Sequence, residues 1–240
     1  MERQMEHSAQ EMAQRIQEIR EKMALAAQKA GRRPQEVLLC AASKMQDAET
    51  VRPASALNID LFGENRVQEL VEKLQHSAYG EKPVHFIGHL QTNKVKQVVG
   101  NVALIQSIGS LHLMEAVEKQ AALKEICQPI LLQVNIGGEE SKSGFAQEDL
   151  SEALETAQRF SHLRVEGLMA IPPIRETDEE NRRDLANVRR CFERLASQCG
   201  QGAEMRWLSM GMSGDFENAI LEGANLVRVG TSIFGARNYP

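Results

Sequence analysis

The feature that most constrains the fold is a strict alternation of short apolar segments with longer amphipathic segments along the 240 residues. The apolar segments end in polar residues, which is typical of strands buried on both faces of a parallel sheet. They predict eight strands, at residues 37–42, 58–62, 84–87, 103–108, 130–136, 164–170, 205–210 and 226–230. Helical spacing of apolar residues fills the gaps. This order predicts an α/β fold, a (β/α)₈ TIM barrel, with an open doubly wound sheet as the alternative.

The chain begins with a segment of helical character. Its apolar residues are spaced three and four apart, at Met5, Met12, Ile16, Ile19, Met23 and Ala26. We expect residues 1–30 to form an amphipathic helix that packs on the barrel, with Gly31 as its C-cap. No Gly/Ser-rich or Pro-rich linker divides residues 1–240, so we expect a single domain. The near-heptad stripe of this helix leaves a dimer as the alternative to the monomer that we expect.

Charge and composition exclude several classes of function. A net charge of −5 disfavours binding to nucleic acid. The apolar runs are far shorter than the ~20 residues that cross a bilayer, and the N-terminus lacks a signal sequence, so we expect a cytoplasmic protein without a membrane span. Cys40, Cys127, Cys191 and Cys199 show no metal-ligand spacing, so we expect reduced thiols and no metal site.

Active sites of TIM barrels lie in the loops after the carboxyl ends of the strands, which makes the strand ends a filter for functional residues. The filter selects residues 43–44, 63–66, 88–89, 135, 140–144, 209–213 and 230–231. Lys44 follows the first strand directly, where partial desolvation lowers the pKa of an amine and frees it as a nucleophile for a Schiff base. The alternative is a solvated lysine whose aliphatic part lies along the barrel rim.

Two segments late in the chain suit an anionic ligand. Residues 209–215 are rich in glycine and hydroxyl groups and precede a predicted helix, so their N–H groups can approach an oxyanion. Residues 230–232 offer the same features after the last strand, and TIM barrels often bind phosphate at these two loops. The alternative is that Ser213 and Asp215 only cap the helix.

An amine and two anion sites at one rim predict a phosphorylated aldehyde as ligand, and pyridoxal 5′-phosphate (PLP) fits that description. Arg228 lies two residues before Gly230 and therefore on the same face of its strand. It is our candidate for the partner of the ring nitrogen. The alternative is an ion pair packed inside the barrel.

Ordered blocks along nearly the whole chain carry a family resemblance. They are residues 43–44 (SK), 62–66 (FGENR), 85–94 (HFIGHLQTNK), 134–135 (VN), 140–145 (ESKSGF), 167–172 (GLMAIP), 208–216 (LSMGMSGDF) and 227–237 (VRVGTSIFGAR). With these blocks the chain resembles the pyridoxal phosphate homeostasis proteins, the YggS/PROSC type. The resemblance implies a barrel similar to the alanine racemase N-terminal domain, PLP fold type III.

The resemblance also implies roles for individual residues. Lys44 would carry PLP as a Schiff base, and Asn65 would lie near the ring. The phosphate would be held by Ser209, Ser213, Gly230 and Thr231, with Met210 in the same cofactor-binding set. Arg228 beside the ring nitrogen resembles the arrangement in alanine racemases, and it would disfavour ring protonation. The family often has Thr-Lys-Pro after the lysine, whereas this chain has Met45, Gln46 and Asp47, which makes the rim less basic.

The function implied is intracellular PLP homeostasis without a catalytic residue, with PLP-dependent apo-enzymes as partners and at most a weak side activity. One alternative is a PLP-dependent racemase or decarboxylase, which needs a second acid or base facing Lys44. Racemases of this fold take a tyrosine from an additional domain, for which no residues follow Pro240. The candidates here are His89, Cys40, Tyr79 and Tyr239. A barrel for small phosphorylated metabolites, without a Schiff base, is a further alternative. Lys94 and Lys142 are hypothetical second amines.

Overall fold

The computed structural model describes residues 2–137 and 143–235. Its strands are β1 (Leu38–Ala42), β2 (Leu61–Glu64), β3 (Val84–Phe86), β4 (Leu104–Ile108), β5 (Gln128–Val134), β6 (Leu163–Ala170), β7 (Ala203–Ser209) and β8 (Leu226–Val229). The helices between them are α2 (Ala48–Ala54), α3 (Val67–Gln75), α4 (Val95–Val98), α5 (Leu111–Leu123), α6 (Leu150–Gln158), α7 (Asp178–Ala196) and α8 (Phe216–Leu221). α1 (Glu2–Lys29) precedes the barrel and α9 (Thr231–Phe234) follows β8. Two 3₁₀ turns, η1 (Pro34–Glu36) and η2 (Thr92–Lys94), complete the described elements.

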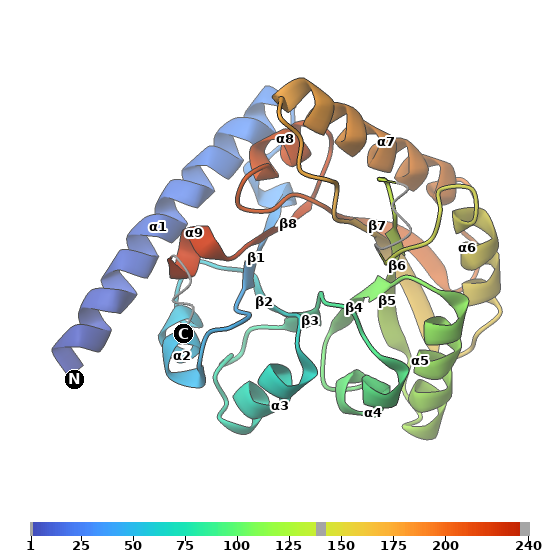
Figure 1. Cartoon of the computed structure of the whole chain (residues 1–240), viewed down its shortest axis with the longest axis horizontal. Coiled ribbons are helices and arrows are strands. Elements are labelled where there is room, and N and C mark those ends of the chain that lie inside the picture. The colour runs from blue at the N-terminus through green and yellow to red at the C-terminus, as the bar shows by residue number, and fades with distance from the viewer. Residues whose placement is uncertain (1, 138–142, 236–240) are drawn as a thin grey trace.

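The strands form one closed parallel barrel in chain order. β8 pairs with β1 from Leu38↔Leu226 to Ala41↔Val229, which closes the ring. Figure 1 shows the strands at the centre with the helices around them. The prediction of a (β/α)₈ barrel is confirmed, and the open doubly wound sheet is wrong because β1 and β8 would then have no common ladder.

The predicted strand bounds agree with the structure to within two residues except at the second strand. The sequence predicted residues 58–62, whereas β2 runs from Leu61 to Glu64. Residues 58–60 precede the ladder, and Gly63 and Glu64 extend it by pairing with His85 and Phe86. A glutamate and a glycine look like loop residues in the sequence, but the Glu64 carboxylate finds a cation in α3 and is therefore buried inside the fold.

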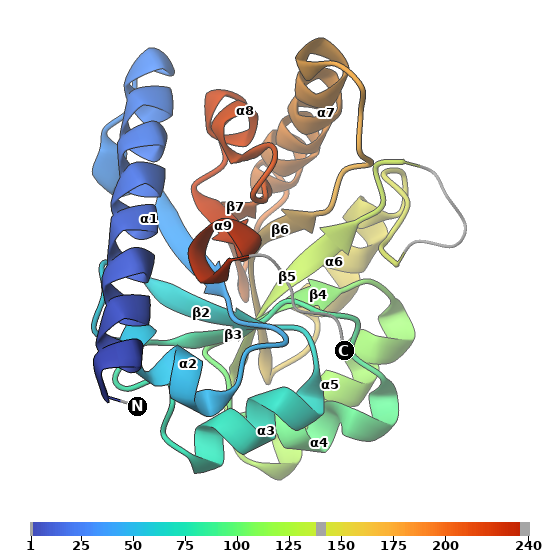
Figure 2. The same ribbon diagram turned by 60° about the vertical axis from the view of Figure 1, so that its left-hand side comes forward.

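The N-terminal helix α1 lies along the outside of the barrel, beside α8 and α9 (Figures 1 and 2). Its apolar stripe at Met12, Ile16, Ile19 and Met23 is buried within this chain. Gly31 has the left-handed φ of 69° that ends the helix, as predicted. Among the described residues, no helix combines the length and the apolar character that crossing a membrane requires.

The barrel interior changes in character along its axis. Apolar clusters of Cys40, Leu61 and Leu226 and of Leu104, Leu131 and Met169 fill one part of it, with Trp207 packed against both. Nearer the carboxyl ends the buried side chains are polar, and they include His85, Gln106, Ser209 and Arg228. Apolar packing thus fills the barrel towards the amino ends of the strands, and buried polar side chains form a layer, the floor of the site, under their carboxyl ends.

Candidate functional site

A cavity of about 510 Å³ lies at the carboxyl ends of the strands. Its walls come from the ends of β1, β2, β3, β5, β6, β7 and β8. The predicted residues that line it are Lys44, Asn65, Ser213, Arg228, Gly230 and Thr231, and the strand-end residues His89, Asn135 and Ser143 line it as well. The fold therefore brings the residues that the strand-end filter selected near both ends of the chain together in one site.

Lys44 stands on a tight turn directly after β1. The Gln46 N–H donates to the Ser43 carbonyl at 3.2 Å, which closes the turn around Lys44 and Met45. Met45 has a φ of 63°, a left-handed conformation that disfavours residues with a Cβ. The turn directs the Lys44 side chain to the cavity wall and leaves it half-buried.

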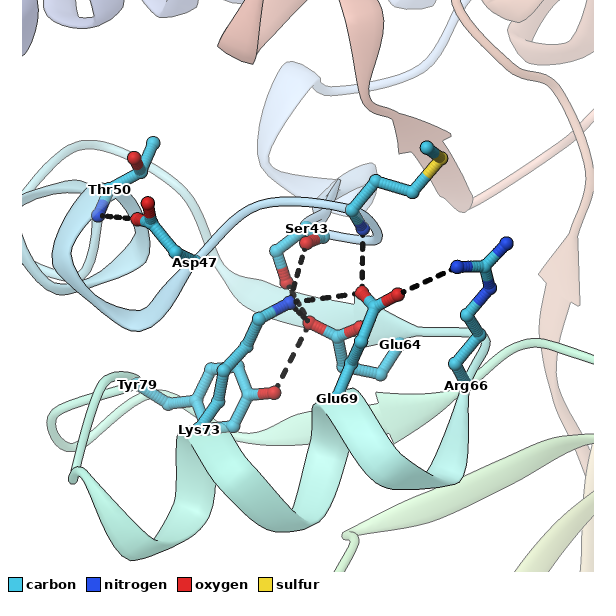
Figure 3. A network of polar contacts seen from close by, with 9 residues as sticks. Ser43, Asp47, Thr50, Glu64, Arg66, Glu69, Lys73 and Tyr79 are labelled. Atoms are coloured by element: carbon cyan, nitrogen blue, oxygen red, sulfur yellow. Dashed lines mark hydrogen bonds and ion pairs between the residues drawn. The ribbon is translucent and has the colours of Figure 1, made fainter. Parts of the chain in front are cut away.

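The backbone below this turn rests on a buried polar network, drawn in Figure 3. The Glu64 Oε1 atom accepts from the Ser43 hydroxyl at 2.6 Å, from Lys73 Nζ at 2.7 Å and from the Tyr79 hydroxyl at 3.2 Å. Burial raises the pKa of Glu64, and the charge of Lys73 acts against that rise. Burial, with the Glu64 charge second, also raises the pKa of Tyr79, so the phenol stays protonated and donates. Sequence reasoning did not identify Lys73, because its four-residue spacing from Glu69 is also the spacing of an ordinary exposed ion pair on a helix.

A chain of hydrogen bonds crosses the barrel beneath the cavity. Arg228 Nη1 donates to Ser209 Oγ at 2.6 Å, and Ser209 Oγ donates to Gln106 Oε1 at 2.6 Å. Gln106 Nε2 lies 2.9 Å from His85 Nδ1, and Arg228 Nη2 donates to the Ala170 carbonyl at 2.8 Å. Burial lowers the pKa of Arg228 to about 10, so the guanidinium remains charged at neutral pH. Its hydrogen bonds among the described residues go to Ser209 and the Ala170 carbonyl and not to a carboxylate, which argues against the predicted alternative of an ion pair inside the barrel.

The two predicted anion loops meet through one hydroxyl. Ser213 Oγ accepts from the Gly230 N–H at 3.4 Å and from the Thr231 hydroxyl at 3.2 Å. The Asp215 carboxylate accepts from the Met212 N–H at 2.7 Å, which folds the first loop back on itself. No Ser213 or Asp215 side chain forms a capping bond to α8 in this described segment, so capping alone does not account for these residues. A Cβ built on Gly214 would meet nothing within 4 Å, which leaves this backbone open to a ligand.

Two of the predicted cofactor contacts lie away from the cavity surface. Ser209 is the last residue of β7, and its hydroxyl is committed to Gln106 and Arg228. Met210 points into the packing between barrel and helices and is fully buried. Their placement does not support the predicted direct contact with a phosphate. Met212 and Gly214, two and four residues after Met210, line the cavity in their place.

Among the proton-transfer candidates, Tyr79 lies in the helical layer on Glu64, outside the cavity. Burial raises the pKa of Cys40 to about 12, which keeps this thiol protonated. His89 does line the cavity, and its Nδ1 lies 3.1 Å from Ser143 Oγ. Lys94 is the last residue of η2 and is not a wall residue. Lys142 and Tyr239 lie outside the described residues.

One buried acceptor in the cavity wall is available to a ligand. Asn65 Oδ1 is shielded from solvent and has no hydrogen-bond partner among the described residues. Gly88 allows the two backbones to approach closely, because a Cβ on Gly88 would lie 2.2 Å from the Asn65 carbonyl oxygen. A buried acceptor without a donor costs free energy, so its presence in a cavity wall suits a ligand that donates a hydrogen bond. The donor set as a whole suits an aldehyde that carries an anionic group.

Comparison with known proteins gives concordant matches. The profile of the family described as alanine racemase, N-terminal domain, matches residues 10–238. A pyridoxal phosphate homeostasis protein of Aquifex aeolicus is 39% identical over 226 residues, covering 94% of this chain and 98% of its own. A structure of PipY from Synechococcus elongatus PCC7942 with PLP bound superposes with a TM-score of 0.80 at 31% identity, over 93% of this chain and all of PipY.

An alanine racemase of Clostridium difficile superposes with a TM-score of 0.70 at 15% identity, over 85% of this chain and 53% of the racemase. At this level of identity the likeness concerns the fold alone.

Proposed function

The chain belongs to the alanine racemase N-terminal domain family and, within it, to the pyridoxal phosphate homeostasis proteins, and from this premise we propose that it binds PLP reversibly in the cavity at the strand ends. The observation that carries the proposal is the convergence of three groups on one cavity. Lys44 provides an amine, the loops joined by Ser213 provide donors for an anion, and Arg228 provides a cation at the floor. In our proposal Lys44 holds PLP as a Schiff base.

When bound, PLP supplies an aldehyde that an amine can attack, and a phosphate dianion. We assign the phosphate to Met212, Ser213, Gly214, Gly230 and Thr231. The Ser213 and Thr231 hydroxyls can turn their protons to an oxyanion, and the Gly230 N–H lies at the start of α9 beside them. Asn65 lies in the wall between Lys44 and the β3 end, where its amide would contact the ring substituents.

The proposal that the protein holds the cofactor without turnover rests on its similarity to homeostasis proteins, and Arg228 fits it without deciding it, because the resemblance gives alanine racemases the same arginine. An arginine next to the ring nitrogen keeps that nitrogen unprotonated, because two positive charges in a buried site repel each other. An unprotonated ring withdraws electrons poorly, which weakens the chemistry that PLP-dependent enzymes use. We propose that the protein takes part in PLP homeostasis and passes PLP to apo-enzymes, as a monomer. All four cysteines are free, which fits a reducing compartment such as the cytoplasm.

The test is the visible absorption spectrum of the purified protein mixed with PLP, followed by borohydride reduction and mass mapping of the adduct. We expect an imine band, an adduct on Lys44, and loss of both in Lys44→Ala. Lys96→Ala is the matched control, since Lys96 is exposed on α4 and absent from the cavity wall. Binding of PLP without an adduct would overturn the Schiff base and leave a site for small phosphorylated ligands.

Turnover separates this proposal from a racemase or decarboxylase. The loaded protein is incubated with single enantiomers of amino acids, and racemisation and carbon dioxide release are measured. We expect rates close to those of free PLP. Sustained turnover that is lost in His89→Ala would instead identify an enzyme, because His89 is the described proton-transfer candidate in the cavity wall.

A further inference from the structure

The two peptide groups on either side of Lys44 are both held by side chains of α3. Lys73 Nζ donates to the Ser43 carbonyl at 2.7 Å, and the Met45 N–H donates to Glu69 Oε2 at 2.6 Å. Lys73 and Glu69 lie one turn apart on α3 and form an ion pair of 3.5 Å. Figure 3 shows both side chains pointing from the helix towards this turn. One helix therefore fixes the backbone before and after the residue whose amine reaches the cavity.

Lys73 also forms an ion pair with Glu64 of β2, and this second pair is almost completely buried. The Lys73 side chain is 2% exposed and the Glu64 side chain 0%. Removing two charges from water costs so much that a buried ion pair is weak evidence of stabilisation. The specific effect of this pair is to position Ser43, the residue before Lys44. Lys73 Nζ donates to the Ser43 carbonyl, and Glu64 accepts from the Ser43 hydroxyl.

The turn itself requires such a restraint. Met45 adopts a φ of 63°, which a residue with a Cβ leaves unless its surroundings hold it. The bond from the Met45 N–H to Glu69 is the contact that holds this peptide group against the helix. Without it the turn is expected to relax towards an extended backbone, and the Lys44 side chain would leave the cavity wall.

We propose that Lys73 and Glu69 of α3, together with Glu64 of β2, are positioning residues that fix the Lys44 backbone so that its amine is presented to the aldehyde. The inference rests on the proposed function, since it concerns the same amine. In the addition a C=N bond forms between Lys44 Nζ and the aldehyde carbon, and the aldehyde oxygen leaves as water with the two protons of the amine. Misplacing a reacting atom by about 1 Å can slow such a step by about a hundredfold.

The first experiment uses three substitutions on α3. Glu69→Ala removes the acceptor for the Met45 N–H, Glu69→Gln keeps an oxygen acceptor, and Glu72→Ala is the control because Glu72 is exposed on the same helix. In the PLP-free protein, we expect Glu69→Ala to speed hydrogen exchange of the Met45 amide by about tenfold. With PLP added, we expect the same variant to form the Lys44 adduct at least about tenfold more slowly. Glu69→Gln and Glu72→Ala should behave as the parent protein.

The second experiment removes the buried pair without leaving a lone charge. Lys73→Met alone would strand the Glu64 carboxylate and is expected to lower the folding yield. The double variant Lys73→Met/Glu64→Gln keeps the site neutral, and we expect it to fold, to form the adduct about tenfold more slowly and to change the visible circular dichroism of bound PLP. Lys82→Met is the matched control, because Lys82 Nζ also donates to a carbonyl, that of Ile59, 2.7 Å away.

The outcomes separate this inference from the proposed function. A parent protein that forms no adduct on Lys44 overturns the proposed function, whereas hydrogen exchange of Met45 still tests the restraint. A parent protein that forms the adduct while Glu69→Ala and the double variant form it equally fast, with unchanged circular dichroism, overturns the inference. A Glu69→Gln variant as slow as Glu69→Ala also contradicts it, because the acceptor oxygen is then not the feature that matters.

Discussion

The hydroxyls of Ser213 and Thr231 lie 3.2 Å apart and join the loops that follow β7 and β8. Ser213 also accepts from the Gly230 N–H, so a single side chain organises donors from two segments. The proposed phosphate site depends on this junction, because it brings the Ser213 hydroxyl of one loop to the N–H and hydroxyl donors of the other.

Ser213→Ala is expected to weaken PLP binding by about tenfold, since a hydrogen bond to a charged group contributes about 1.5 kcal/mol. Titration with PLP and with pyridoxal, which lacks the phosphate, checks the cause. The loss should appear for PLP and vanish for pyridoxal. Ser197→Ala is the control, because its hydroxyl donates to the Arg194 carbonyl at the end of α7 and Ser197 is not a residue of the cavity wall. Equal losses for both ligands would contradict the phosphate assignment.

Ser209→Ala tests whether this residue contacts the phosphate or orients Arg228. The structure places its hydroxyl between Arg228 and Gln106, below the cavity. We therefore expect binding to fall by a similar factor, about threefold to tenfold, for PLP and for pyridoxal, as the loss of about 1 kcal/mol implies. A loss confined to PLP would restore the contact that the sequence predicted.

His85 predicts a stability that falls in acid. Burial lowers its pKa from 6.5 to about 3, and Gln106 Nε2 donates to its unprotonated Nδ1. Between these two pH values the unfolded chain binds a proton that the folded chain does not, so the free energy of unfolding decreases as pH falls below 6.5. The slope contributed by one such group is at most about 1.4 kcal/mol per pH unit.

Urea unfolding at pH 7 and pH 5 measures this slope. His85→Gln should lose less stability between the two pH values than the parent protein does. His112→Gln is the control, since His112 is exposed on α5. An unchanged pH dependence in His85→Gln would refute the assignment.

The buried face of α1 predicts a role in stability. Ile16 is 1% exposed, so Ile16→Ala is expected to lower the free energy of unfolding by about 3 kcal/mol through lost contacts and a cavity. Leu25→Ala on the same helix should change it by less than about 0.5 kcal/mol, because Leu25 is 57% exposed. Denaturant unfolding with light scattering checks both, and dissociation of a dimer by Ile16→Ala would show that the stripe serves a partner instead.

The barrel could be predicted because its signal repeats at every strand. Each apolar run that ends in polar residues identifies a strand and, at its end, a rim position, which is how Lys44, Asn65 and Gly230 were found. The strand-end filter placed Ser209 at the rim, whereas its hydroxyl lies in the barrel interior below the cavity. Whether the last residue of a strand faces the rim or the interior depends on register and tilt, which local sequence does not encode.

Residues in the helical layer could not be predicted in the same way. The strand-end filter selected Glu64 of β2 as a rim residue and did not select Lys73 of α3, and only their pairing across two elements explains why both are buried. Such pairing is a property of tertiary packing, and no local pattern distinguishes Lys73 from an exposed helical lysine. The residues that prepare a site are therefore harder to find than those that line it.

The ladder between β1 and β8 places Lys44 and Arg228 in one cavity although they lie near opposite ends of the chain. The proposed binding site is therefore absent from a partly synthesised chain, and it forms only when the last strand closes the ring. This seam adjoins the β7–β8 pair, whose ladder is registered at Ser209↔Leu226. A ligand that contacts both β1 and β8 binds the closed ring and not conformations with β8 detached. Such a ligand therefore stabilises the last step of folding.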